Sequence, residues 1–334
     1  MSLSFITGVD IGHYSIKAVV IKPVKGTLVL TDFRELVIEE SIFSDNHLLN
    51  YQQIVNKLKE LRKALPLFSR KVALSVPDNS VISKVLQIDK HLSVQEKEYA
   101  IIELFSHQTP FELEELCLDY CAIPINNPSE LTEPIQIYAT KKEVVDNRVD
   151  AFRKAGFTPL LLDVHAHGLV RLWQAVASIQ NRSNWLLLEV GYTRSSLVID
   201  FVGQAPWCKE LPIGVEIINH PIEDDASTHH CSTMHFINSL VERIQRQLQL
   251  IGTMDKKQLQ GIWLTGGGAN TPMLAEELAS RLDVECELFD PLSLLISSPR
   301  YKNQRLPCGY SYASAMGLAL QGIDWMEQGH ASSN

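Results

Sequence analysis

The sequence lacks several features that would assign it to common protein classes. Among its 334 residues no apolar run approaches the roughly 18 that a membrane-spanning helix needs. Met1 to Asp10 has no basic cluster before an apolar stretch, unlike a secretory signal. The six cysteines, between residues 117 and 308, form no Cys-x-x-Cys pair, which indicates reduced thiols. We therefore expect a cytoplasmic protein without a membrane span of its own.

Positive charge is also scarce. The chain has 30 Lys and Arg against 39 Asp and Glu, a net charge of −9, so nucleic acid is not an expected partner. Two common nucleotide fingerprints, GxxxxGK[ST] and GxGxxG, are absent. The hydrophobic fraction of 45% and charged fraction of 21% are typical of a globular α/β protein with two or more domains.

Strand-like and helix-like patterns alternate along the chain. Strands are expected at 4–9, 15–21, 27–38 and 72–76, with an amphipathic helix at 50–65 before the last of them. This βββαβ order is typical of an RNase H-like lobe. A similar start recurs at 185–191 and 195–201, followed by helix 236–250, strand 262–265 and helix 272–282. The sequence therefore predicts two related lobes.

Residues 81–155 have a different pattern and read as a small α+β insert. A helix over 94–105 is expected to begin at an N-cap, Ser93, with Glu96 completing a capping box. The rest of the chain is expected to form strands 117–123, 134–140 and 160–163, helices 141–155, 166–179 and 310–321, a polar loop at 220–233 and a flexible tail at 327–334.

Three glycine-containing turns follow buried strands: 8–12, 189–191 and 265–268. Glycine lets backbone amides approach phosphate oxygens, and the acids Asp10 and Glu189 can hold Mg²⁺ through water. A single turn of this kind is more often an ordinary tight turn. Three in this order and spacing favour a nucleotide site.

These turns and four further segments carry a resemblance to the actin-like ATPase superfamily and, within it, to the PilM family, relatives of FtsA. Thr109–Tyr120 (TPFELEELCLDY) is similar to the family stretch "PFPLEEVxLDY". The segment 155–163 (AGFTPLLLD) resembles "AGLxPxxLD", and the motifs at 290–291 and 315–319 also fit. The resemblance covers nearly the whole chain.

The resemblance implies an actin-like ATPase fold of two RNase H-like lobes with an FtsA-type subdomain 1C insert. Its subdivision is 1–80 with 156–182 (subdomain 1A), 81–155 (1C), 183–215 with 255–326 (2A) and 216–254 (2B). It further implies a type IV pilus scaffold at the inner face of the inner membrane, ATP with Mg²⁺ in the cleft, and the N-terminal peptide of a PilN-type membrane protein as partner. Other pilus assembly and motor proteins and self-association are further implied partners.

The resemblance also assigns cofactor-binding residues to the three turns and to a helix near the adenosine. They are Asp10, Gly12, His13, Tyr14, Ser15 and Lys17; Gly191, Tyr192, Thr193, Arg194 and Gly214; Arg243 and Arg246; and Gly266, Gly267 and Gly268. Metal binding is assigned to Asp10 and Glu189, through water.

Some positions depart from the family pattern. His13, Tyr14 and Tyr192 are bulky where small residues are usual, and His165 stands where an acid orients the attacking water. We therefore expect weak or absent ATP hydrolysis, with Asp10, Glu189, Asp163 and His165 as the candidate catalytic residues. The alternatives are an active ATPase or filament-forming protein, and a sugar or acyl kinase for which Asp163 would be the base.

Three other clusters of polar side chains can be interpreted either as ordinary solvated surface or as a functional site. His229, His230, Cys231 and His235 can suggest zinc, but a solvated loop is the better interpretation. For the acidic run Glu112, Glu114 and Glu115, a solvated face is preferred over a partner contact. Lys57, Lys59, Arg62, Lys63 and Arg70 form a basic face, with solvation preferred over a role at anionic lipid.

Overall fold

The computed structural model describes residues 5–38, 42–43, 48–123, 131–201, 205–219, 226–254, 259–298 and 308–331. The remaining residues are not described. Within this part, no helix combines the length and the apolarity needed to cross a membrane.

The first lobe is built on a six-stranded sheet in the order β14-β3-β2-β1-β4-β8. β1 pairs antiparallel with β2 and parallel with β4, and β4 pairs parallel with β8. β2 also pairs antiparallel with β3. The strands are β1 (Ile6–Ile11), β2 (Ser15–Val24), β3 (Thr27–Val37), β4 (Lys71–Val76), β8 (Thr158–Val164) and β14 (Ile296–Ser297).

The second lobe repeats this topology in a five-stranded sheet, β11-β10-β9-β12-β13. β9 pairs antiparallel with β10 and parallel with β12, as β1 does with β2 and β4. The strands are β9 (Trp185–Val190), β10 (Ser195–Ile199), β11 (Trp207–Leu211), β12 (Gly261–Thr265) and β13 (Glu285–Leu288). The two lobes predicted from the sequence are therefore present, in the same strand order.

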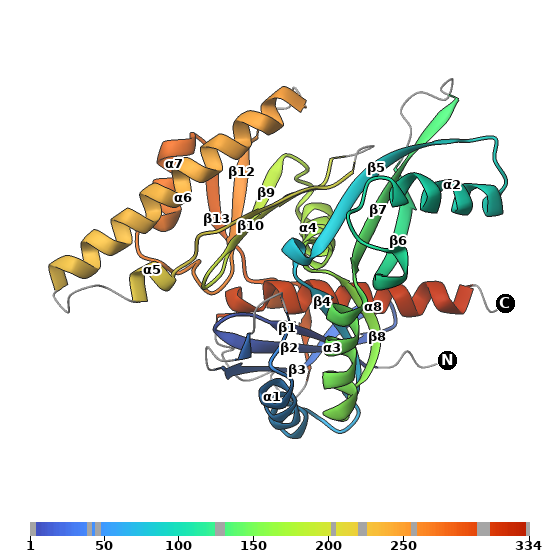
Figure 1. The fold of residues 1–334 in the computed structure, drawn as a ribbon. Helices are drawn as coiled ribbons and strands as arrows, with labels where there is room; N and C mark the ends of the chain where they lie inside the picture. The colour runs from blue at the N-terminus through green and yellow to red at the C-terminus, as the bar shows by residue number, and fades with distance from the viewer. Residues whose placement is uncertain are drawn as a thin grey trace.

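Two helices, α4 (His165–Gln180) and α8 (Ala313–Ala331), pack against each other between the two sheets. In Figure 1, α8 runs as a single red rod between the lobes. A Cβ at Gly317 of α8 would come closer than 3.0 Å to the backbone of Gly168 in α4, and one at Gly8 of β1 would do the same with Ala315. Glycine at these positions lets α8 touch both α4 and the first sheet.

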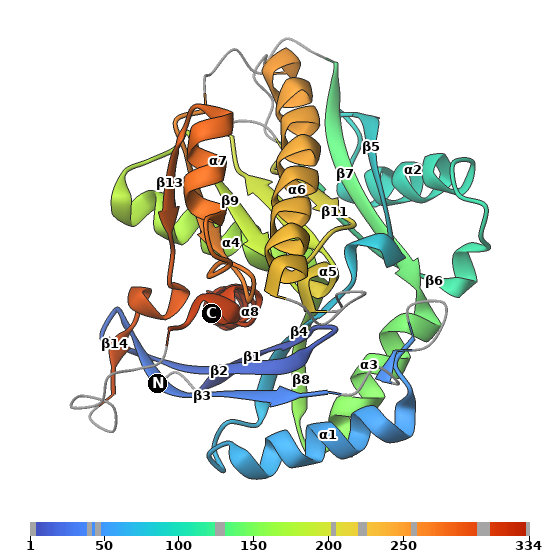
Figure 2. The ribbon, with the colours of Figure 1, turned by 90° about the vertical axis from the view of Figure 1, so that its left-hand side faces the viewer.

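The other helices cover the outer faces of the sheets. α1 (Tyr51–Ala64) and α3 (Lys142–Lys154) pack together on the first sheet, where Phe152 of α3 belongs to the same buried cluster as Leu58 of α1. α6 (Ala226–Met254) and α7 (Leu274–Leu282) cover the second sheet, as Figure 2 shows. The short helices are α5 (Glu216–Asn219) and the 3₁₀ turns η3 (Asp78–Ser80), η4 (Leu113–Glu115), η5 (Pro291–Leu294) and η6 (Tyr310–Tyr312).

The insert forms a separate three-stranded antiparallel sheet, β5-β7-β6, covered by α2 (Val94–Ser106). Its strands are β5 (Val81–Asp89), β6 (Leu116–Ala122) and β7 (Thr132–Lys141). Ile101 and Phe105 of α2 pack with Leu86 and Ile137 in a core of their own. The capping box of Ser93 and Glu96 is formed as predicted.

Two local expectations were wrong. Residues 226–233, expected in a polar loop, form the start of α6, while 220–225 lie outside the described residues. Residues 327–331, expected in a flexible tail, continue α8, and 332–334 are not described. Strands β5, β11, β13 and β14 were not expected, because they are short or largely unburied and so lack a clear period-two apolar pattern.

Candidate functional site

A cavity of about 750 Å³ lies between the lobes, where the turns after β1 and β9 face each other. Both turns join the first two strands of their sheets, so the repeated topology brings them to the same cleft. The cavity falls in the range of about 300–1,000 Å³ that small-molecule sites occupy.

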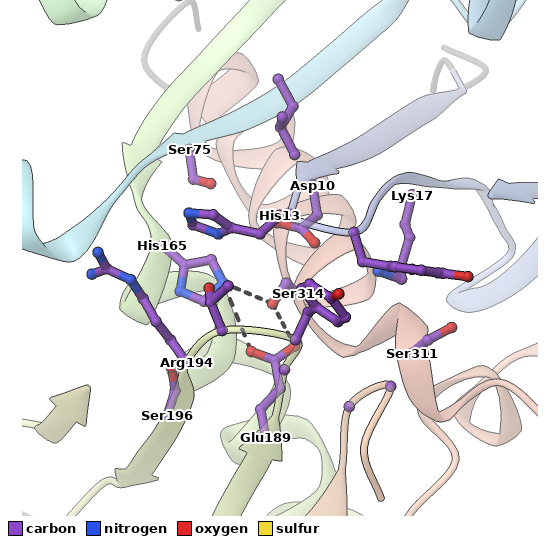
Figure 3. A pocket seen from close by; sticks show the side chains of 18 of the residues that line it. Asp10, His13, Lys17, Ser75, His165, Glu189, Arg194, Ser196, Ser311 and Ser314 are labelled. Atoms are coloured by element: carbon purple, nitrogen blue, oxygen red, sulfur yellow. Dashed lines mark hydrogen bonds and ion pairs between the residues drawn. The ribbon is translucent and has the colours of Figure 1, made fainter. Parts of the chain in front are cut away.

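Most of the predicted site residues line this cavity. They are Asp10, Gly12, His13, Tyr14 and Lys17 from the first lobe, Glu189, Gly191, Tyr192, Thr193 and Arg194 from the second, Gly266 and Gly267 after β12, and His165 at the start of α4. Figure 3 shows the side chains of Asp10, His13, Lys17, Glu189, Arg194 and His165 converging on the same space.

Other predicted residues lie elsewhere. Ser15 is buried and donates to Glu35 Oε1 at 2.6 Å, and Gly214 packs against the backbone of Tyr192. Gly268 is enclosed by Val190 and Val215. Arg243 and Arg246 are exposed on α6, where Arg246 pairs with Glu242 at 3.8 Å. These five are not among the residues lining the cavity.

The glycine turns are closed by their own backbone bonds. The amides of Gly12 and Gly191 donate to the carbonyls of Ser15 and Arg194 at 3.1 and 2.9 Å, so the two turns are built alike. Gly267 is less enclosed than Gly12 and Gly191, because a Cβ there would meet only Ser311, at 4.0 Å. The amides of His13, Thr193 and Gly267 form no backbone hydrogen bond within the described part of the chain. They are donors available to an anion.

His165 lies at the floor of the cavity between two carboxylates. Its Nε2 is 2.8 Å from Ser314 Oγ, which in turn donates to Glu189 Oε1 at 2.7 Å. Its Nδ1 is 3.5 Å from Asp78 Oδ2. Asp78 also accepts from the amide of Ala166, the second residue of α4. Both ring nitrogens of His165 thus face acceptors, which is the arrangement of a protonated imidazole.

The electrostatics of this cluster agree with a charged His165. Burial opposes the charge, but the hydrogen bond to Asp78 and the charges of Asp78, Glu189 and Asp10 raise the pKa of His165 to about 10. Burial raises the pKa of Glu189, against the effect of His165. Burial also acts to raise the pKa of Asp78, yet its contacts with His165 leave it below the usual value. His165 is therefore a cation that balances Asp78 and Glu189.

The remaining charged groups of the cleft surround this cluster. Lys17 lies 3.8 Å from Glu35, and Arg194 forms an ion pair with Glu210. Partial burial and the charge of Arg194 lower the pKa of His13, whose ring stacks on Phe43 at 4.4 Å between centroids. Within the described residues the Asp10 side chain has no hydrogen bond or ion pair, although Asp10 lines the cavity.

Asp163, the candidate base of a kinase, is occupied outside the cavity. Its Oδ1 is 2.7 Å from His167 Nδ1 and its Oδ2 accepts from Gln321 at 2.7 Å. It is not among the cavity-lining residues. A catalytic role for Asp163 would require both partners to move.

Several residues of the site were not predicted from the sequence. Asp78 lies two residues after the end of β4, so the Pro77-Asp78 pair that follows this buried strand was the signal that could have found it. Ser314 sits at the start of α8, where no local pattern distinguishes it from the small residues that pack beside it. Ser75, Arg148, Glu210, Asn270 and Ser311 also line the cavity.

A family model described as "Type IV pilus assembly protein PilM" matches residues 8–228 and 233–323. This chain belongs to the PilM family. The match includes both lobes, the insert and most of α8, so the resemblance carried by Thr109–Tyr120 is confirmed.

Solved structures agree on the fold. A PilM-PilN type IV pilus biogenesis complex matches with a TM-score of 0.78 at 22% identity, covering 96% of this chain and 98% of that one. The ethanolamine utilization protein EutJ from Carboxydothermus hydrogenoformans matches with a TM-score of 0.52 at 13% identity, covering 96% and 90%. A diol dehydratase-reactivating factor matches with a TM-score of 0.54 at 8% identity, covering 96% and 100%. The fold is the actin-like ATPase fold that the sequence predicted.

Proposed function

We propose that this PilM-family protein acts as a scaffold that binds the cytoplasmic N-terminal segment of a PilN-type membrane protein on its insert and a nucleotide in its cleft. The observation that carries the peptide part is the match to a PilM-PilN complex over nearly the full length of both chains. Recruitment by such a partner would place the protein at the inner face of the inner membrane.

The insert has the features that recognition of an extended peptide uses. β5 and β6 are the outer strands of its sheet, so each has one edge without a strand partner in that sheet. Apolar side chains stand exposed around them, including Val94, Tyr99 and Leu104 of α2 and Tyr120 of β6. A strand edge beside exposed apolar side chains is suited to a peptide that pairs its backbone and buries a few anchors.

Titration of the protein with the N-terminal peptide of the PilN-type protein from the same organism tests this role. Three or four buried anchors at about 1.5–3 kcal/mol each are enough for micromolar binding. Tyr99→Ser with Tyr120→Ser should weaken binding at least tenfold, whereas Ile179→Ser, at an exposed apolar site on α4, should not. Absence of binding at 1 mM peptide would contradict the proposal.

For the nucleotide, the cavity residues are better suited to bind phosphate groups than to supply all the ligands of a metal ion. Amide donors at His13, Thr193 and Gly267 can accompany Lys17 in binding phosphate oxygens. Mg²⁺ bound with a nucleotide would neutralise phosphate charge. Asp10 is the carboxylate placed to hold its water shell, because Glu189 already accepts from Ser314 and lies 3.8 Å from His165.

Calorimetric titration with ATP, with and without Mg²⁺, tests the proposed nucleotide binding in the cleft. Asp10→Ala should reduce the gain in ATP affinity that Mg²⁺ provides. Lys17→Ala should reduce the affinity for ATP both with and without Mg²⁺. Lys209→Ala, an exposed lysine on β11, is the matched control. If ATP at millimolar concentration with Mg²⁺ does not bind, the cleft serves structure only and the peptide role stands alone.

A further inference from the structure

The turn between α1 and β4 carries exposed apolar side chains next to exposed cations. Leu67 is 82% exposed and Phe68 is 50% exposed, and they are neighbours in the chain. Lys63 and Arg70 are exposed on either side of them. We use "basic turn surface" for Lys63, Leu67, Phe68 and Arg70. In Figure 1 the turn between α1 and β4 lies at the lower edge of the first lobe, away from the sheet of the second lobe.

Hydrogen bonds fix the backbone of this turn, so the exposed side chains project from a defined position. Arg62 donates to the carbonyls of Pro66 and Leu67 at 3.0 and 2.9 Å. Ser69 is buried and donates to the Pro66 carbonyl at 2.6 Å, and its own carbonyl accepts from Thr7 at 3.4 Å. Below the turn, the ring of Phe68 lies 3.9 Å from that of Phe5 between centroids.

Charge is concentrated here against the sign of the whole molecule. The stretch from Lys57 to Lys71 has six basic residues and one acid, Glu60, which pairs with Lys57 at 3.6 Å. Lys22 extends the charge, 5.0 Å from the centroid of the Phe5 ring. The chain as a whole has a net charge of −9. A negatively charged surface is therefore attracted to this edge and repelled by much of the remainder.

We propose that the basic turn surface contacts the anionic surface of a lipid bilayer, with Leu67 and Phe68 entering the headgroup region and the surrounding cations pairing with lipid phosphates. A tip of two apolar side chains ringed by Lys and Arg is the arrangement that interfacial membrane contacts use. A bilayer fits both properties of this surface, because its phosphates can pair with the cations while its headgroup region can accept Leu67, which is 82% exposed. This contact adds to any recruitment through a PilN-type partner and does not depend on it.

Flotation of the purified full chain with vesicles tests the proposal in the absence of any protein partner. Binding is expected to vesicles of phosphatidylcholine with phosphatidylglycerol, and not to phosphatidylcholine alone. It should weaken strongly when NaCl is raised from 0.1 to about 0.5 M, because the salt shortens the screening length. Each basic residue near an anionic surface contributes about fivefold, so Lys63→Glu with Arg70→Glu should reduce binding by about 25-fold or more.

Matched variants separate the two contributions. Leu67→Ser with Phe68→Ser should reduce binding at least tenfold and leave the salt dependence of the residual binding in place. Ile179→Ser and Lys209→Glu, which alter exposed residues elsewhere, should not change vesicle binding. All six altered residues are exposed, and matching circular dichroism melting curves would confirm that the variants fold.

Equal flotation with and without the anionic lipid, or unchanged binding in both sets of turn variants, would overturn the proposal. The proposal would also be overturned if the unaltered protein failed to float at low salt and the turn variants instead lost binding to an acidic protein of the pilus machinery. That last result would assign the surface to a protein. Peptide titration on the insert is unaffected by any of these outcomes, so the two proposals fail separately.

Discussion

The rings of Tyr14 and Tyr192 face each other across the mouth of the cleft, with centroids 5.3 Å apart and planes inclined at 37°. Tyr14 comes from the turn after β1 and Tyr192 from the corresponding turn after β9, so equivalent turns of the two lobes touch through their aromatic side chains. Two of the three bulky residues that departed from the family pattern thus form a contact between the lobes.

This contact predicts a measurable coupling between the two residues. Aromatic pairs of this geometry contribute about 0.5–1.5 kcal/mol beyond the area they bury. A double-mutant cycle of Tyr14→Ala and Tyr192→Ala, measured by urea unfolding, should give a coupling energy in that range. Tyr14→Ala paired with Tyr51→Ala, an exposed tyrosine on α1, should give additive effects, and a similar coupling there would remove the interpretation.

His165 predicts a pH-dependent stability. Because its pKa in the folded protein is raised from 6.5 to about 10, its stabilising contribution is fully present below about pH 6.5 and is lost as pH rises through about 10. His165→Gln should lower the free energy of unfolding at pH 7 by about 2–4 kcal/mol, since Asp78 and Glu189 lose their cation. The difference between wild type and variant should shrink towards pH 10.5.

Thermal melts of both proteins from pH 6 to 10.5 provide the measurement. Comparing the two proteins at each pH removes the titration of residues that they share. A difference that stays constant across this range would show that His165 is not charged in the folded state.

The glycine contact between α4 and α8 predicts a large effect from a small substitution. Gly317→Ala should destabilise the fold by about 2 kcal/mol or more, because its Cβ would meet the backbone of Gly168, which cannot move aside. Gly329→Ala, in the same helix but with open space at the Cβ position, should stabilise by about 0.5–1 kcal/mol. Chemical unfolding checks both, and equal effects would contradict this packing.

The capping box predicts a local effect in the insert. Ser93→Ala removes the acceptor for the Glu96 amide and should cost about 1 kcal/mol. Ser106→Ala, at the opposite end of α2, removes only a bond to the Glu103 carbonyl and should cost less. Because the insert has its own core, hydrogen exchange of α2 should rise in Ser93→Ala while exchange in the second lobe stays unchanged.

Hydrolysis of ATP by the purified protein should stay well below about 1 per second, the lower end of ordinary enzyme turnover. A base must accept a proton, and a protonated His165 bound to Ser314 and facing Asp78 has no free lone pair. A phosphate-release assay with Asp10→Ala as the blank checks this. Faster turnover that disappears in that variant would show that another group activates the water.

The sequence predicted the fold well because the fold rests on repeated local patterns. The buried runs of β1 and β9 and the turns that follow them could be read directly, and Ser93 with Glu96 marked a helix start correctly. The start of α6 was missed because its polar, histidine-rich first turns resemble a loop, and helices are stabilised by packing as much as by local preference.

The site was predicted only in part, for a physical reason. Residues such as His13 and Gly267 sit in turns whose pattern is visible locally. The partners of His165 come from η3, β9 and α8, far apart in sequence, and only the folded topology brings Asp78 and Ser314 to it. For that reason the local sequence could not indicate the charge of His165, which the assembled acids favour.

The position of α8 has a consequence for how this protein is made. The first strand of the chain packs at Gly8 against Ala315, and α8 also lines the second lobe. During synthesis β1 leaves the ribosome long before the helix that covers it, so the apolar surface between the lobes stays open until α8 has been made. Packing of the two lobes against α8 is thus delayed until that helix is available, and this apolar surface is exposed during the interval.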